Sequence, residues 1–235
     1  IGDNTNSLNI TNANLGNSSD TLNLKLENAK DVNMFVPSGY EFSKISLNGD
    51  SNLNKLIALD LKDFKIDGSG NFLYGDGLNN LISFNSEDLI GGVKGQELNE
   101  DNFSIFPLVG SDVGSEINLG LLQDNIFFKD KAENDKRNNI NLNDGDDFIK
   151  IDLANFSSNK IDAGSGDDNF KIIGEKTSEN DVFLGGNGYD KFEIDQSKNN
   201  YININNIEEV IFSNSAEGKN IFGDIKNPLN IKIMS

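Results

Sequence analysis

The sequence GGNGYDKFE at residues 185–193 decides the fold of this chain, because two earlier segments repeat its pattern. The earlier copies read LNDGDDFIK at residues 142–150 and AGSGDDNFK at residues 163–171. Each copy has glycine at the fourth place, aspartate at the sixth and a large apolar residue at the eighth. The sixth-place residues Asp147, Asp168 and Asp190 follow one another at intervals of 21 and 22 residues. This period predicts a solenoid whose coils each hold two nonapeptides and a short insertion.

Weaker copies of the pattern lie between these three segments. In each, an asparagine or aspartate stands two places before an apolar residue, as in Asn138/Ile140, Asn159/Ile161, Asp181/Phe183 and Asn199/Tyr201. The apolar residues then form one series, spaced mostly by nine residues: Ile140, Ile149, Ile161, Phe170, Phe183, Phe192, Tyr201 and Val210. The series predicts columns of side chains that point inward between two parallel sheets, with each coil depending on its neighbours for stability.

The rest of the chain carries strand patterns and few helix signals. Residues 21–26, 44–47 and 148–151 alternate apolar and polar side chains with a period of two, as strands do. Residues 86–90 begin like a capped helix but run at once into Gly91 and Gly92, which leaves room for a turn or two of helix at most. The sequence therefore predicts an all-β fold with a parallel β-roll or β-solenoid in its C-terminal half and a β-strand-rich module in its N-terminal half.

The composition excludes several kinds of function. The chain has no cysteine and no histidine, so it has no disulfide, no zinc site of the usual type and no Ser-His-Asp or Cys-His nucleophile system. Its formal net charge is −18, which favours cations as partners and disfavours nucleic acid and anionic lipid. The chain has no run of 18 apolar residues, so we expect no membrane insertion. The start at Ile1 lacks both an initiator methionine and a signal sequence, so we expect a piece of a longer chain.

The repeated turns offer the oxygen ligands that calcium prefers. Glycine allows positive φ and lets backbone carbonyls converge, while the sixth-place aspartate adds a carboxylate. Two stacked turns can surround one ion with six or more oxygens, which predicts one site between Asp147 and Asp168 and another between Asp168 and Asp190. The candidate metal-site residues are Asp144, Gly145, Asp146, Asp147, Ala163, Gly164, Ser165, Gly166, Asp167, Asp168, Gly185, Gly186, Asn187, Gly188 and Asp190. The alternative is a set of plain Asp-Gly turns, which need no metal.

The repeat resembles the repeats-in-toxin (RTX) family of calcium-binding β-rolls, whose consensus is Gly-Gly-x-Gly-x-Asp-x-apolar-x. The copy at residues 185–193 fits it fully, Ala163 replaces the first glycine of the second copy, and Leu142 and Asn143 replace the glycine pair of the first. Residues 195–213 are similar to a segment that often follows such repeats in large type I-secreted surface proteins, including some bacterial S-layer proteins. The resemblance implies bound Ca²⁺, a secreted protein at the bacterial cell surface, and folding that waits for extracellular calcium.

Two domains are predicted, divided in the charged run at residues 129–137. Residues 1–135 form a solenoid-like or other β-rich module, and residues 136–235 form the RTX-like roll with C-terminal strands. Within the first domain, residues 75–81 look like a decayed repeat with Asn79 in place of the aspartate.

Three functions remain open at this point. The first is a structural segment of an S-layer-type surface protein that folds and assembles with calcium, its partners being calcium ions and further copies or other surface-layer subunits. The second is a module of a large RTX adhesin that binds a cell-surface glycan or a peptide. Phe103, Phe106, Phe127 and Phe128 either line such a site or belong to the core. The third, an enzyme, is not expected, because no catalytic constellation stands out among 38 acidic residues.

Overall fold

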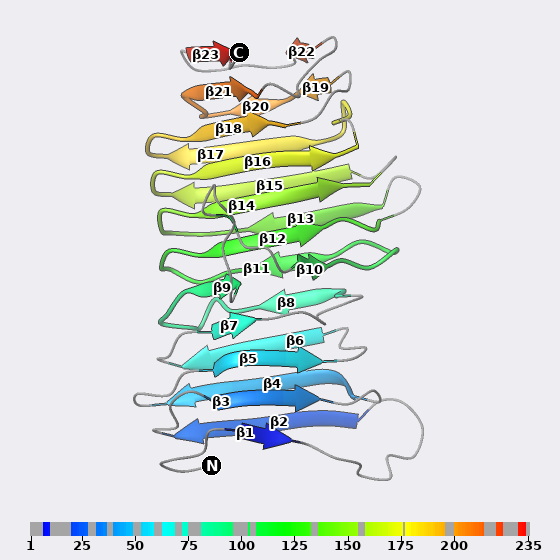
Figure 1. Ribbon diagram of the computed structural model, residues 1–235, viewed down its shortest axis with the longest axis vertical. Coiled ribbons are helices and arrows are strands. Elements are labelled where there is room, and N and C mark those ends of the chain that lie inside the picture. The colour runs from blue at the N-terminus through cyan, green and yellow to red at the C-terminus, as the bar shows by residue number, and fades with distance from the viewer. Residues whose placement is uncertain are drawn as a thin grey trace.

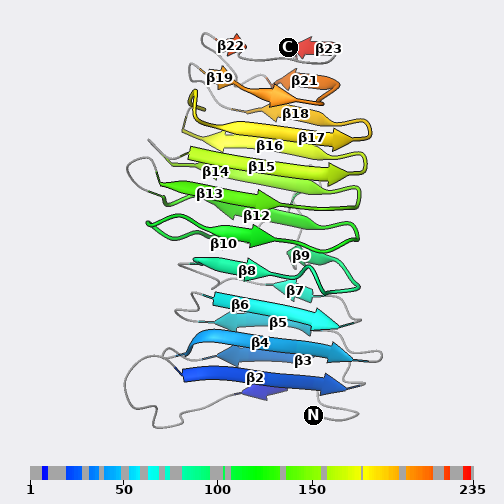
Figure 2. The same cartoon turned by 180° about the vertical axis from the view of Figure 1, so that it is seen from behind.

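The chain folds as an all-β parallel solenoid, seen from two opposite sides in Figures 1 and 2. The computed structural model describes residues 7–9, 20–27, 32–36, 40–48, 53–58, 63–68, 72–74, 81–95, 103, 107–132, 136–154, 158–175, 177–195, 200–213, 220–222 and 230–233. The coils stack along the long axis of the molecule, with the N-terminus at one end and the C-terminus at the other (Figure 1).

Sheet A forms one wall of the solenoid. In the described residues it has twelve strands, which pair in parallel. They are β1 (Ser7–Asn9), β3 (Val32–Val36), β5 (Leu53–Ala58), β7 (Phe72–Tyr74), β9 (Val93–Gly95), β10 (Pro107–Val109), β12 (Asn125–Lys129), β14 (Phe148–Leu153), β16 (Asn169–Gly174), β18 (Lys191–Ile194), β21 (Glu209–Phe212) and β23 (Asn230–Ile233).

Sheet B forms the opposite wall, with nine strands in the part of the chain that the structure describes. They are β2 (Asp20–Glu27), β4 (Tyr40–Asn48), β6 (Asp63–Gly68), β8 (Ser83–Asn85), β11 (Glu116–Asn118), β13 (Arg137–Asn141), β15 (Ser158–Ser165), β17 (Val182–Asn187) and β20 (Ile204–Asn205). Two further strands, β19 (Asn200–Ile202) and β22 (Asn220–Phe222), pair only with each other. The strands predicted at residues 21–26, 44–47 and 148–151 are confirmed as β2, β4 and β14.

The core lies between the two sheets and consists of columns of apolar side chains. In sheet B, Ile140 pairs with Ile161, which pairs with Phe183. In sheet A, the predicted column continues from Ile149 through Phe170 and Phe192 to Val210. All seven residues are buried, so this part of the predicted series is confirmed. Strand β14 shows the cause, because its side chains alternate between buried and partly exposed positions along a pleated strand.

Aromatic rings fill the middle of the C-terminal core. Phe170 meets Phe183 and Phe192 with ring centroids 6.4 and 6.1 Å apart, and the rings of Phe183 and Phe192 lie 4.7 Å apart. These tilted and edge-on arrangements suit the charge distribution of aromatic rings. Each fully buried phenylalanine also removes enough apolar surface from water to contribute roughly 1.5–3 kcal/mol. Ring packing within one coil, as between Phe183 and Phe192, and between coils, as between Phe170 and Phe192, therefore stabilises this region.

The prediction that Tyr201 points into the core is wrong. Tyr201 is 39% exposed, and Ile204 takes the place in sheet B beside Phe183. The reason is the insertion that each coil carries on this side of the solenoid. Twelve residues separate Ile149 from Ile161, and twelve also separate Phe192 from Ile204, whereas the nine-residue spacing stops short at Tyr201.

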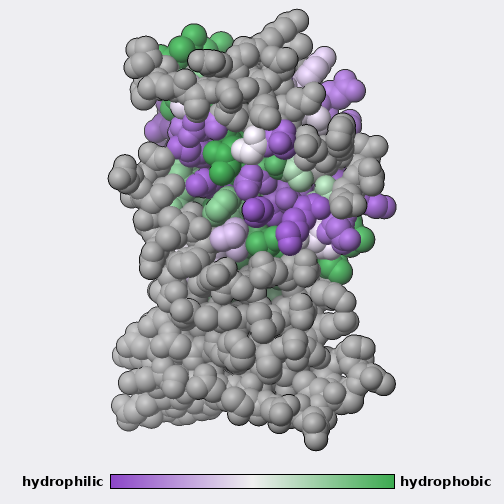
Figure 3. All heavy atoms as spheres, turned by 45° about the vertical axis from the view of Figure 1, so that its right-hand side comes forward, coloured by the Kyte–Doolittle hydropathy of each residue, from purple (hydrophilic) through white to green (hydrophobic). Residues whose placement is uncertain are grey.

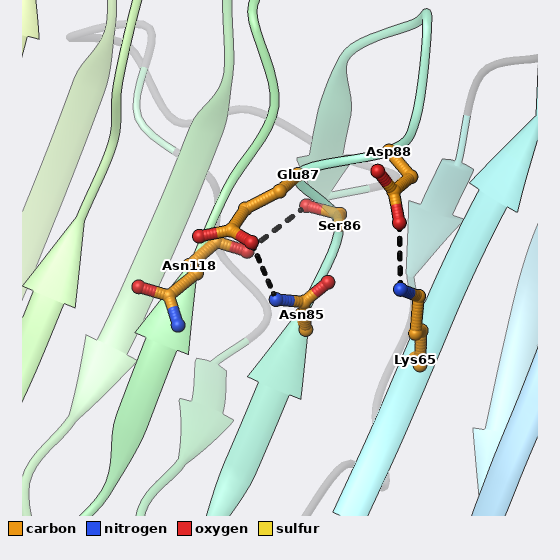
Figure 4. Close-up of polar contacts among 6 residues, drawn as sticks. All are labelled: Lys65, Asn85, Ser86, Glu87, Asp88 and Asn118. Carbon is orange, nitrogen blue, oxygen red and sulfur yellow. Dashed lines mark hydrogen bonds and ion pairs between the residues drawn. The ribbon is translucent and has the colours of Figure 1, made fainter.

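The turn after β8 replaces the short helix considered for residues 86–90. One backbone bond, from the Leu89 amide to the Ser86 carbonyl at 2.9 Å, closes a single turn, and the described residues contain no helix. Figure 4 shows how side chains hold this turn: the Ser86 hydroxyl donates to the Asn118 carbonyl and Lys65 pairs with Asp88 at 2.6 Å. These bonds join three neighbouring coils.

Both sheets continue past the predicted domain boundary near residue 135. Strand β11 pairs with β13 in sheet B, and β12 pairs with β14 in sheet A. The described N-terminal strands therefore belong to the same solenoid architecture, and the division into two domains stays a prediction. No helix in the described part of the chain has the length and apolar character that crossing a bilayer requires.

Candidate metal centre

The three repeated turns lie on one edge of the solenoid, at the left of Figure 1, where the chain passes from sheet B to sheet A. They follow β13, β15 and β17 and lead into β14, β16 and β18. Their register is direct: Asp144 bridges to Ser165, Gly164 pairs with Gly186, and Ser165 pairs with Asn187. The structure thus brings equivalent residues of all three predicted turns into stacked rows.

The second and fourth places of each turn adopt a backbone conformation that favours glycine. At the fourth place the residue above also approaches closely: a Cβ on Gly166 would collide with the Gly145 carbonyl oxygen, and a Cβ on Gly188 with that of Gly166. Asparagine tolerates positive φ better than most residues, which explains how Asn143 replaces a glycine. The φ angles are 71° at Asn143, 96° at Gly164, 106° at Gly186, 132° at Gly145, 139° at Gly166 and 140° at Gly188.

The sixth-place carboxylates form a buried row. Asp147, Asp168 and Asp190 are each 0% exposed. Oδ1 of Asp168 accepts the amide of Asp147 at 2.8 Å, and Oδ1 of Asp190 accepts the amide of Asp168 at 3.0 Å. Oδ2 of each of the three has no hydrogen-bond partner among the described residues. In Asp168 and Asp190, one carboxylate oxygen therefore bonds to the neighbouring coil, and the other oxygen has no hydrogen-bond partner.

Two residues that the sequence reasoning missed extend this row. At its N-terminal end, the Asp124 amide donates to Oδ1 of Asp147 at 2.7 Å, and Oδ1 of Asp124 in turn accepts the Val93 amide at 2.6 Å. At its C-terminal end, Oε2 of Glu208 accepts the Asp190 amide at 2.8 Å. Asp124 stands two places before the buried Ile126, which is the signal that could have identified it.

Burial makes the ionised form of these carboxyls unfavourable. It raises the pKa of Asp147 to about 9, that of Asp168 to about 7 and that of Asp190 to about 6, and neighbouring acids add to each shift. A buried charge that lacks a partner is costly, so each group must hold a proton or meet a cation. The unpartnered carboxylate oxygens, and turn carbonyl oxygens that lie close to the glycines of the next turn, are an oxygen-only donor set, which fits a hard divalent cation.

Other acids of the turns lie on the outside: Asp144 is at the third place, and Asp146 and Asp167, at the fifth, form a second row. Asp144, Asp146 and Asp167 are exposed, which lets solvent reach their carboxylates. Oδ1 of Asp146 accepts the Asp167 amide at 2.9 Å, and Oδ1 of Asp167 accepts the Tyr189 amide at 2.8 Å. No group of three or more acidic side chains in the described residues is close enough to hold a metal ion. A bound cation would therefore need backbone carbonyl oxygens besides carboxylates.

The opposite edge of the solenoid carries a different polar ladder. Nδ2 of Asn138 donates to Asn159 at 2.8 Å, and Nδ2 of Asn159 donates to Oδ1 of Asp181 at 2.9 Å. Oδ2 of Asp181 accepts the Ser178 amide at 2.6 Å, so both carboxylate oxygens have partners. Figure 3 looks toward this side and shows mainly hydrophilic residues, with apolar ones among them, where the residues are described. Oδ1 of Asn138 lacks a hydrogen-bond partner within the described residues, but it is a neutral amide oxygen. The unpartnered oxygens of the glycine turns belong to carboxylates, which makes those turns the better place for a cation.

The three described aromatic residues considered for ligand binding do not gather on the surface. Phe103 is buried against Phe148, with ring centroids 5.8 Å apart, and Phe128 lies in the core. Phe127 is half-buried beneath the Lys150 ammonium, which stands 4.7 Å from its ring centroid. Phe106 and Asn199 lie outside the described residues, as does the decayed repeat around Asn79.

Comparison of the chain with protein-family models, with curated proteins and with solved structures finds no match.

Proposed function

We propose that this chain is a calcium-stabilised structural segment of a secreted bacterial surface protein of the S-layer type, and that it folds and assembles when calcium binds. The observation that carries the proposal is the row of buried sixth-place carboxylates, each with one oxygen that lacks a partner. The RTX-like repeat at residues 142–193 supports calcium as the ion.

The ligands in this proposal are Asp147, Asp168 and Asp190 together with backbone carbonyls of the glycine turns. A calcium ion bound between two turns supplies positive charge that offsets the burial of their carboxylates. The chain contributes the spacing, because the amide bonds of Asp147 and Asp168 to the next carboxylate hold successive turns in register. The glycines contribute close approach of the turn backbones, which a side chain would prevent.

Calcium binding of this kind couples folding to location. Extracellular calcium modules typically bind with dissociation constants of about 10⁻⁴–10⁻³ M. In a calcium-poor cytosol the buried carboxylates lack their counter-ions, and the chain stays poorly folded until it reaches millimolar calcium outside. With these dissociation constants, calcium at about 1 mM stabilises the folded chain by about 0.4–1.4 kcal/mol per site, and a 100-fold excess does so by about 2.7 kcal/mol. The absence of cysteine and the strong acidity agree with a secreted location.

The proposed role is structural rather than catalytic, and its natural partners are further copies or other surface-layer subunits. A solenoid suits this role because its strands pair along one axis and its side faces repeat with each coil. The adhesin alternative gains nothing from the described phenylalanines named for it, because Phe103 and Phe128 are buried and Phe127 lies under the Lys150 ammonium.

Calorimetric unfolding in EDTA, in calcium and in magnesium tests the metal part of this proposal. We expect calcium to raise the melting temperature strongly and magnesium to do so weakly, because magnesium demands tighter octahedral geometry. We also expect Asp168→Asn to reduce the calcium response. Equal melting temperatures in EDTA and calcium would refute calcium stabilisation. Electron microscopy of the calcium-loaded protein tests assembly: ordered arrays support it, and dispersed single particles contradict it.

A further inference from the structure

Asp124 shares its burial and its hydrogen-bonded Oδ1 with the aspartates of the repeat, although the Lys94 charge acts on it and its turn keeps only the second-place glycine, Gly120. It is 1% exposed, and its Oδ2 has no hydrogen-bond partner within the described residues. Its Oδ1 accepts a backbone amide from the preceding coil, that of Val93, as the sixth-place carboxylates do. The Lys94 ammonium, on the next residue, is directed to Oε1 of Gln123 at 3.5 Å. Asp124 is therefore a buried carboxylate with one oxygen unassigned.

The turn that ends at Asp124 lies close against the turn that ends at Asp147. The Asp124 amide is bonded to Oδ1 of Asp147 at 2.7 Å, so the two carboxylates occupy successive steps of one row. A Cβ on Gly145 would come within 2.8 Å of both the Leu122 carbonyl carbon and the Gln123 amide nitrogen. Backbone of the earlier turn thus reaches the glycine at the fourth place of the first repeat. Oδ2 of Asp147 is also buried and unpartnered.

We propose that an additional calcium ion binds at this step, with Asp124 and Asp147 as its carboxylate ligands. The proposal rests on the proposed calcium function and extends it to a turn outside the repeat. The Asp124 amide bonds to Oδ1 of Asp147 just as the Asp147 amide bonds to Oδ1 of Asp168, and Oδ2 of each of these residues lacks a hydrogen-bond partner in the described part of the chain. The exposed Leu121 and Leu122 stand at the third and fourth places of this turn, so its remaining ligands are backbone carbonyls or water rather than side chains.

The competing explanation is a neutral Asp124 that holds a proton in an apolar surrounding. Asp124→Asn separates the two, because an amide has the shape of a neutral carboxyl group and cannot supply the negative charge that a calcium ligand needs. The measurement is the number of calcium ions bound per chain, by native mass spectrometry and by calorimetric titration of the EDTA-stripped protein. Wild type, Asp124→Asn, Asp168→Asn and Asp181→Asn are compared.

Asp181→Asn is the matched control. Asp181 is also buried and also accepts an amide from the preceding coil, that of Asn159, but both of its oxygens have partners. Its substitution is expected to lower stability without changing the number of calcium ions. Far-UV circular dichroism in calcium verifies that each variant is folded.

We expect Asp124→Asn to bind one calcium ion fewer than wild type, with Asp181→Asn unchanged. An unchanged count in Asp124→Asn, with a reduced count in Asp168→Asn, overturns the additional site and leaves the proposed function standing. A wild type that binds no calcium overturns both. The wild-type count is a readout that needs no variant to fold: the steps among the three repeat turns provide two sites, so three ions support the extra site and two ions contradict it.

Discussion

The backbone amide of Asp147 donates a hydrogen bond to Oδ1 of Asp168 at 2.8 Å, while Oδ2 of Asp168 has no partner among the described residues. One side chain thus performs two tasks. It holds two coils in register through the bonded oxygen, and its other oxygen is buried without a hydrogen-bond partner. The same division holds at Asp190, so the row is a repeated structural unit.

Asp168 is expected to matter more for calcium than Asp190. It faces proposed sites on both of its sides, whereas Asp190 is followed by Glu208 at the end of the row. Asp168→Asn should lower the calcium-dependent part of the unfolding free energy by about 2.7 kcal/mol for each site lost at 100-fold calcium excess. Calorimetric unfolding of Asp168→Asn and Asp190→Asn, each in calcium and in EDTA, measures the two calcium responses. Equal calcium responses of the two variants would contradict the shared-ligand arrangement.

The stability of the calcium-free protein should fall as pH rises from about 4 to about 9. Burial raises the pKa of Asp190 to about 6, that of Asp168 to about 7 and that of Asp147 to about 9, above an ordinary value of about 3.9. The folded chain then binds more protons than the unfolded chain within this range, so raising the pH favours unfolding.

Thermal unfolding in EDTA at several pH values measures this slope. Calcium should flatten it, because bound calcium replaces the protons that the folded carboxyls otherwise hold. The pKa values of folded Asp190 and Asp168 lie between about pH 5 and about pH 8. A calcium-free protein that becomes more stable as the pH rises through this range would contradict the assignment of buried, unpartnered carboxyls.

Phe170→Ala should destabilise the protein with or without calcium. Phe170 is buried between Phe183 and Phe192, and its removal leaves a cavity that the flanking coils cannot close. We expect a loss of about 3–5 kcal/mol in the free energy of unfolding, measured in calcium by chemical denaturation. Phe127→Ala, at a half-buried position outside the core, is the control and should cost much less. An unchanged midpoint for Phe170→Ala would show that the column does not carry the fold.

Gly166→Ala should impair both folding and calcium response. The backbone at Gly166 has φ of 139°, and a Cβ there would collide with the Gly145 carbonyl oxygen. Strain of this kind costs on the order of 1–3 kcal/mol. The neighbouring Ser165→Ala, at a residue without positive φ, is the matched control. If the two variants melt at the same temperature, the close stacking of the turns is not required.

The sequence was sufficient to predict the solenoid because its information is periodic. Each repeated position has one structural role: the fourth-place glycine adopts positive φ, the sixth-place aspartate bonds to the neighbouring coil, and the eighth-place apolar residue enters the core. Ile140, Ile161 and Phe183 lie in one column, as their spacing predicts. Tyr201 was misplaced because the nine-residue spacing does not record an insertion between two strands. Insertion length is set by how far the chain must travel outside the sheets, which no local pattern encodes.

The candidate site was predictable only in its central part. The stacked turns around Asp168 follow from the motif. The sequence signal for Asp124 is only its place two residues before Ile126, and the hydrogen bonds between coils are what put Asp124 and Glu208 in the row. Leucines occupy the turn before Asp124, and the turn before Glu208 is shortened, so neither resembles the repeat in sequence. Their position in the row depends on the register of the neighbouring strands, which is a property of the folded solenoid.

The most direct test of calcium-dependent folding is size-exclusion chromatography with light scattering on one sample, first in EDTA and then in millimolar calcium. We predict a monomer in EDTA that is less stable and less compact than in calcium, and that enters larger, ordered assemblies once calcium is added. Identical elution and mass under the two conditions would contradict the claim that calcium holds the turns of this solenoid together.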